Sequence, residues 1–184
     1  MAQVQRYHAT VIILHWVMAL CFILMLASGL AFQFDLIADK SLKFKMYQWH
    51  KSLGVLLMFA LVLRVAARLM FKAPKLPNAI PKKDQVLSKL GHLAMYGFMI
   101  AMPVTGWVMV SSSPYGLPTV VFDMFTWPHI PSLAGDTEMN SLSKFGHKWL
   151  GWAFIALIVL HVAAVVVHLK KEKINLLKRM SFRG

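Results

Sequence analysis

Residues 141–169 read SLSKFGHKWLGWAFIALIVLHVAAVVVHL, and this stretch decides the fold. It is almost wholly apolar and long enough to predict a transmembrane helix. It also contains His147, His161 and His168. On a helix, His147 and His161 lie within about 40° of the same face and about 21 Å apart along the axis. Because the hydrocarbon core of a bilayer is about 30 Å thick, one imidazole is expected near each membrane surface, in two stacked sites.

The composition of the whole chain is that of a membrane protein. Of its 184 residues, 58% are hydrophobic, which is more than a soluble domain of this size normally carries. The net charge of +13 does not indicate nucleic-acid binding, because the basic residues flank long apolar runs, as they do beside transmembrane segments. The single cysteine, Cys21, excludes an internal disulfide, a covalent CxxCH haem motif and a four-cysteine iron–sulfur cluster.

Four apolar stretches are long enough to cross a membrane. They cover approximately residues 11–34, 47–71, 87–110 and 141–169. Because lipid offers the backbone no hydrogen-bond partners, each span must be helical. The mostly short connections then predict an all-α, integral membrane four-helix bundle, formed by a single domain over residues 1–184.

The distribution of Lys and Arg predicts the orientation. Basic residues gather between the second and third spans and in the tail after Leu169, whereas residues 111–140 contain neither Lys nor Arg. The positive-inside tendency therefore places both termini in the cytoplasm. Residues 35–46 and 111–140 become external loops. The second of these is apolar around Trp127, and we expect an interfacial segment or lid, or a loop that merely anchors, with His129 solvated.

This topology assigns a depth to each histidine within the spans. His15 and His161 are expected near the cytoplasmic side, and His50 and His147 near the external side. A haem iron with two axial histidines needs imidazoles from opposite sides of the porphyrin, and facing helices of a bundle supply them. The depths thus predict two haem sites, with the pairs His15/His161 and His50/His147.

Four glycines and one arginine fit the same two layers. The glycines would let a flat macrocycle approach the helix backbones, or would simply serve helix packing; they are Gly29, Gly54, Gly106 and Gly151. Arg64, fourteen residues after His50, could pair with a haem propionate or an anionic head group. The alternative for the histidines is that they are packing residues held by hydrogen bonds and bind no metal. Zinc or copper is less favoured, since each layer offers two histidines without a carboxylate or further cysteine.

Several segments resemble the bacterial cytochrome b561 family. They are LHW around His15, HKSLG from His50, LGHLAMYGFMIAMPVTGWVM around His92, and GHKWLGW and LHVAAVVVH in the last span. The resemblance covers about residues 6–180. It implies a four-helix dihaem protein of the bacterial inner membrane that moves electrons between a donor and the quinone pool. It also implies that His15, His50, His147 and His161 are the axial ligands of two b haems. Some members of the family are superoxide oxidases that reduce ubiquinone.

Two further histidines match family positions. His168 lies two turns after His161, where it could hydrogen-bond a quinone carbonyl and relay its proton, or could reach the interface beside Lys170. His92 could contact a propionate at the cytoplasmic layer or serve packing. Lysines near the outer pair could steer a small anion such as superoxide, or could be ordinary solvated helix ends; they are Lys40, Lys43, Lys45, Lys51, Lys144 and Lys148.

The leading hypothesis is transmembrane electron transfer from an external donor, with superoxide as one candidate, to membrane quinone. With superoxide as donor, the protein would be a superoxide:ubiquinone oxidoreductase. An alternative is the cytochrome b subunit of a larger membrane dehydrogenase or hydrogenase. A metal-ion or proton transporter belongs to another class. It is less favoured, because Pro103 is the only proline inside a span and no pair of broken half-helices is predicted.

Overall fold

Four long helices dominate the computed structural model, which describes residues 5–75, 77, 80–171 and 174–182. The helices are α1 (Ala9–Gln33), α2 (Lys40–Met70), α3 (Lys82–Ser111) and α4 (Thr137–Lys171). Each is long and apolar enough to cross a membrane, so the predicted all-α transmembrane bundle is confirmed. The two extremes of the predicted 1–184 domain, residues 1–4 and 183–184, lie outside the described residues.

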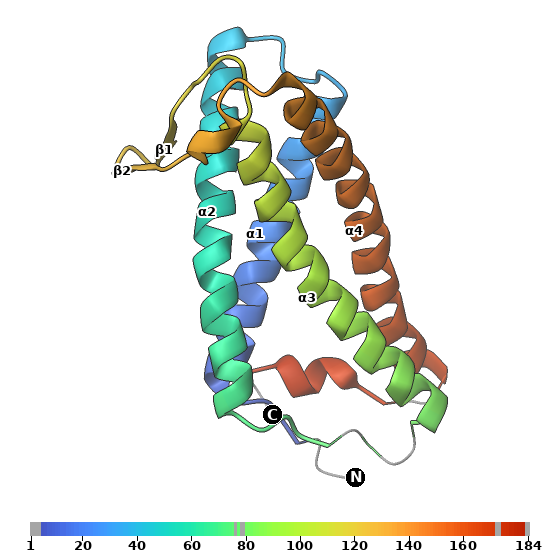
Figure 1. The fold of residues 1–184 in the computed structure, drawn as a ribbon. Coiled ribbons are helices and arrows are strands. Elements are labelled where there is room, and N and C mark those ends of the chain that lie inside the picture. The colour runs from blue at the N-terminus through green and yellow to red at the C-terminus, as the bar shows by residue number, and fades with distance from the viewer. Residues whose placement is uncertain (1–4, 76, 78–79, 172–173, 183–184) are drawn as a thin grey trace.

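The helices run alternately up and down, and the described residues nearest the two ends of the chain lie together at one end of the bundle (Figure 1), where Arg6 donates to the Phe182 carbonyl at 3.2 Å. We call this end, which also carries the connection between α2 and α3, the inner end. The opposite end, which carries the connections between α1 and α2 and between α3 and α4, is the outer end. The cytoplasmic position of the inner end remains a prediction.

All four helices begin earlier than the predicted spans, with α1 beginning at Ala9 rather than 11 and α3 at Lys82 rather than 87. Helix α2 begins at Lys40, so most of the predicted 35–46 loop is helical, and α4 begins at Thr137 rather than 141. Aspartates cap the starts of α2 and α4: Asp39 accepts a hydrogen bond from the Leu42 backbone N–H at 2.7 Å, and Asp136 accepts one from Met139 at 2.9 Å. These first turns are polar, and a search for apolar spans therefore misses them.

The outer connection between α3 and α4 contains a small hairpin. Strands β1 (Thr119–Val121) and β2 (Phe125–Trp127) pair antiparallel, and a 3-10 turn, η1 (Pro131–Leu133), follows them. The hairpin is fixed to α2 through buried Ser52, whose hydroxyl donates to the Val120 carbonyl and accepts from the Phe122 N–H, both at 3.1 Å. The outer loop is therefore a structured element that lies against α2 (Figure 1).

His129, predicted from the sequence to be solvated, is half-buried beside this hairpin. Its Nε2 lies 3.1 Å from the hydroxyl of buried Thr119. Partial burial, together with the nearby Lys51 cation, lowers the pKa of His129. The expectation was wrong because the hairpin folds back over the end of the loop.

The buried core lies at mid-height in the bundle, around Phe154. This side chain is 1% exposed, stacks on Phe98 with ring centres 5.5 Å apart, and meets the edge of Phe22 at 5.2 Å. Phe154 is seven residues from both His147 and His161. The apolar core therefore separates an outer from an inner histidine layer.

The chain after α4 crosses beneath the inner end as a short 3-10 helix, η2 (Leu176–Met180) (Figure 1). Within it, Arg179 is only 4% exposed and donates to the carbonyls of Pro74 at 2.6 Å and Lys75 at 2.8 Å. The Trp16 indole of α1 donates to the Met180 carbonyl at 2.7 Å. Part of the basic tail, η2, thus connects the inner ends of α1, of α4 and of the connection between α2 and α3. We call η2 the strap.

Candidate functional site

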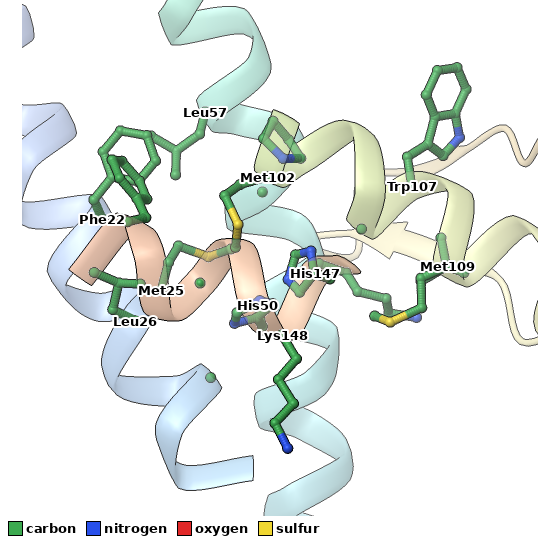
Figure 2. A pocket seen from close by; sticks show the side chains of 18 of the residues that line it. Phe22, Met25, Leu26, His50, Leu57, Met102, Trp107, Met109, His147 and Lys148 are labelled. Atoms are coloured by element: carbon green, nitrogen blue, oxygen red, sulfur yellow. The ribbon is translucent and has the colours of Figure 1, made fainter. Parts of the chain in front are cut away.

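The outer layer is built on two facing imidazoles, His50 from α2 and His147 from α4. Their ring centres are 6.5 Å apart and their planes are inclined by 72°. Figure 2 shows the two rings close together in a cavity, with Met25 and Met102 beside them. Two imidazoles that share one metal, with metal–nitrogen bonds of about 2.0–2.1 Å and ring centres about 1.1 Å from the nitrogens, have centres about 6.3 Å apart. The observed separation fits such an arrangement.

The cavity around this pair has apolar walls and one glycine from each helix. The glycines are Gly29, Gly54, Gly106 and Gly151. A Cβ atom at Gly106 would lie only 3.3 Å from Cε1 of His147, and one at Gly29 would lie 3.9 Å from Cε1 of His50. The space beside the two rings therefore depends on missing side chains, as a flat macrocycle would require.

Two cations also line the outer cavity, Lys51 and Lys148. Lys51 donates to the Pro118 carbonyl at 3.1 Å, which holds its ammonium group near the hairpin. Of the other outer lysines, Lys43 pairs with Asp35, whereas Lys40, Lys45 and Lys144 are exposed. These lysine cations could therefore pair with the carboxylates of a bound group.

The inner layer brings together three histidines and an arginine. The ring centres of His15 on α1 and His161 on α4 are 6.4 Å apart, again close to the separation of two rings that share a metal. His92 on α3 lies nearer to His161, at 5.6 Å, and its Nδ1 donates to the Ser88 carbonyl at 2.6 Å. Arg64 on α2 donates to Nδ1 of His15 at 3.2 Å.

Unpaired buried donors lie in both layers. Among the described residues, three buried side-chain atoms have no hydrogen-bond partner, and they are Gln48 Oε1, Arg64 Nε and Trp127 Nε1. Buried polar groups are nearly always paired. Trp127 lines the outer cavity, and Arg64 belongs to the inner layer. Each could donate to an acceptor on a bound group, so the residues present fit haem, which carries two carboxylates.

His168 lies two turns beyond His161, half-buried near the inner end of α4. Its backbone carbonyl accepts a hydrogen bond from Ile174 at 3.2 Å, where the chain turns toward η2. It stands beyond the inner histidine layer, between that layer and the strap.

Three residues of the site were not predicted from the sequence. The Ser28 hydroxyl lies 2.7 Å from Nδ1 of His50, and the Thr105 hydroxyl lies 3.0 Å from Nδ1 of His147. Trp127, considered only as an anchor, lines the outer cavity and packs against Phe59 and Trp107. Thr105 lies inside the segment around His92 that carries the family resemblance, but neither a motif nor a spacing indicated a role for any of the three side chains at the outer pair.

Comparisons with known proteins show which family this chain resembles. The family model of prokaryotic cytochrome b561 matches residues 6–183. The chain is also similar to cytochrome b561 homolog 2 of Escherichia coli (strain K12), with 32% identity over 177 residues, which cover 96% of this chain and 91% of that protein. Both matches span all four helices and both histidine layers.

Proposed function

Because the chain belongs to the prokaryotic cytochrome b561 family of membrane haem proteins, we propose that it carries electrons across the bacterial inner membrane through two b-type haems. His50 and His147 would hold the iron of the outer haem, and His15 and His161 would hold that of the inner haem. The observation that carries the proposal is the repetition of one geometry at two depths, with ring centres 6.5 Å and 6.4 Å apart. The whole of residues 1–184 then forms one dihaem domain.

Bound haem supplies the one-electron iron couple, and the protein supplies position and charge. At the outer site, Lys51, Lys148 and the Trp127 indole are available to hold carboxylates. At the inner site, Arg64 has that role, because its planar fork suits a carboxylate. His92 can assist when both its ring nitrogens carry a proton, since its Nδ1–H is donated to the Ser88 carbonyl. The apolar core around Phe154 keeps water out of the space between the layers.

At the inner end, His168 and Arg64 are the groups we assign to a membrane quinone, with ubiquinone the first candidate. The His168 imidazole can donate a hydrogen bond to a quinone oxygen and pass it a proton. Reduction of one quinone takes two electrons and two protons. If superoxide is the external donor, two superoxide ions are oxidised to two O₂ for each quinol formed, and the outer lysines would attract the anion.

A second candidate function is that of the cytochrome b subunit of a larger dehydrogenase or hydrogenase. The tip of the outer hairpin favours it, because Phe122, Met124 and Phe125 are exposed by 44%, 80% and 47%. A docked subunit could cover this apolar tip. The transporter alternative has less support, because α3 continues as one helix through Pro103.

The haem content of the purified chain tests the proposal. We expect two b haems per chain by pyridine haemochrome assay, and a sharp b-type band on reduction. A colourless protein obtained with ample haem supply would refute the proposal. Quinone reduction driven by superoxide in the isolated chain favours the oxidase, whereas a second subunit that copurifies favours the larger complex.

Gly106 allows a steric test of the outer site. We expect Gly106→Leu to lower the haem content from two to about one per chain, because even a Cβ there would lie 3.3 Å from His147. Gly97→Leu on the same helix is the matched control, since nothing lies within 4 Å of a Cβ at Gly97. Equal haem content in the two variants would contradict a haem beside Gly106.

A further inference from the structure

Both imidazoles of the outer pair have a hydroxyl group at Nδ1. Ser28 of α1 lies 2.7 Å from His50 of α2, and Thr105 of α3 lies 3.0 Å from His147 of α4. Each outer histidine is therefore held by a helix other than its own. All four helices contribute to this arrangement.

The hydroxyls also contact carbonyls of their own helices, and these contacts set the direction of the hydrogen bonds. Ser28 Oγ lies 2.9 Å from the Leu24 carbonyl and 3.0 Å from that of Met25. Thr105 Oγ1 lies 2.8 Å and 2.9 Å from the carbonyls of Ala101 and Met102. A hydroxyl has one hydrogen, and a carbonyl can only accept. When the hydrogen is donated to a carbonyl, the hydroxyl oxygen accepts from Nδ1–H of the histidine.

This direction fixes the tautomer of the outer imidazoles. The proton of each neutral ring is then on Nδ1, and the lone pair is on Nε2, where it is available to a metal. The inner layer differs, because the group beside Nδ1 of His15 is the Arg64 guanidinium, which has no acceptor atom for an Nδ1–H proton. The hydroxyl contact at Nδ1 therefore distinguishes His50 and His147 from His15.

We propose that Ser28 and Thr105 are positioning residues that hold His50 and His147 as Nδ1–H tautomers and lower the midpoint potential of the outer haem. The inference rests on the haem ligands assigned under the proposed function. An Nδ1–H group that donates to oxygen makes the imidazole a more basic ligand. A more basic ligand favours ferric over ferrous iron, so the hydroxyls shift the outer couple downward and leave the inner couple unaffected.

The test uses Ser28→Ala, Thr105→Val and the double variant of the full chain, with redox titrations followed by absorption and with haem counts. We expect two haems in each single variant. At a fixed potential, the ratio of reduced to oxidised outer haem should rise about two- to tenfold, which corresponds to about 20–60 mV. The double variant should show a larger rise in this ratio. The midpoint potential of the inner haem should not change in any of the variants.

The conservative variants Ser28→Thr and Thr105→Ser keep the hydroxyl and should titrate like the wild type. The proposal is overturned if the variants without hydroxyls have the midpoint potentials of the wild type, or if the midpoint potentials of both haems shift together. It is also overturned if the conservative variants shift the outer midpoint potential as much as the variants without hydroxyls do. Because the two hydroxyls act on opposite ligands from different helices, either variant tests the idea if the other fails to fold. A wild-type chain without two haems would instead refute the proposed function.

Discussion

His147→Ala is expected to lower the haem content of the purified chain from two to about one, and His161→Ala is expected to do the same at the other site. Each substitution removes one of the two histidines proposed to hold the iron in one layer and leaves the other layer intact, about 21 Å away along α4. A redox titration identifies which haem is lost, because the single couple that remains in one variant should be the couple absent from the other.

The inner layer allows a further test of which residue pairs with His161, because two histidines lie near it. The ring of His92 is closer, at 5.6 Å, but that of His15, at 6.4 Å, matches the separation of about 6.3 Å expected for a shared metal. We therefore expect His15→Ala to lose the inner haem and His92→Ala to keep it. His129→Ala, in the outer loop, is the control that should keep both haems. The reverse result at His15 and His92 would refute our inner ligand pair.

Much of this fold could be predicted because a chain that crosses lipid must satisfy its own backbone hydrogen bonds, which few conformations allow. Long apolar runs must be helices, and a fourteen-residue spacing must place two side chains on one face at two depths. The facing pairs followed from the alternating direction of the spans. What the sequence did not reveal lies outside the lipid or depends on single hydrogen bonds.

The missed features have identifiable physical reasons. The outer hairpin has strands of only three residues, and its turn places Phe122 and Asp123 at φ of 46° and 58°, where glycine or asparagine is the usual signal. Ser28 and Thr105 gave no signal, since hydroxyls in membrane helices commonly bond to carbonyls of the preceding turn. Arg179 belonged to a basic tail that indicated orientation, and its burial depends on carbonyls more than a hundred residues away.

Arg64→Leu is expected to lower the midpoint potential of the inner haem by about 100 mV while two haems remain bound. The guanidinium lies 3.2 Å from Nδ1 of His15. Iron at Nε2 would place the ring proton on Nδ1, so this hydrogen bond would be lost, but the cation would stay about 7 Å from the iron. At this distance and an effective dielectric constant of about 20, a cation stabilises the added electron by about 2.4 kcal/mol, or about 100 mV. If Arg64 also neutralises a haem carboxylate, its loss leaves that negative charge unpaired and acts in the same direction.

Arg68→Leu is the matched control, because Arg68 lies one turn along the same helix and is exposed, with its guanidinium over the Tyr7 ring at 5.2 Å. Greater distance and solvent screening should keep its effect below about a third of that at Arg64. Arg64→Lys should restore most of the potential, since it keeps the charge. A fall in the outer potential, or equal shifts in the two leucine variants, would contradict the placement of Arg64 at the inner haem.

The consequence for electron flow is separable from haem binding. A lower inner potential makes the step from the outer to the inner haem less favourable, so less of the inner haem is reduced at a given external potential. Quinone reduction in Arg64→Leu should therefore fall even though the pyridine haemochrome count stays at two. Arg64→Lys separates charge from geometry: recovery of the potential without recovery of quinone reduction would mean that the planar guanidinium itself contacts the quinone.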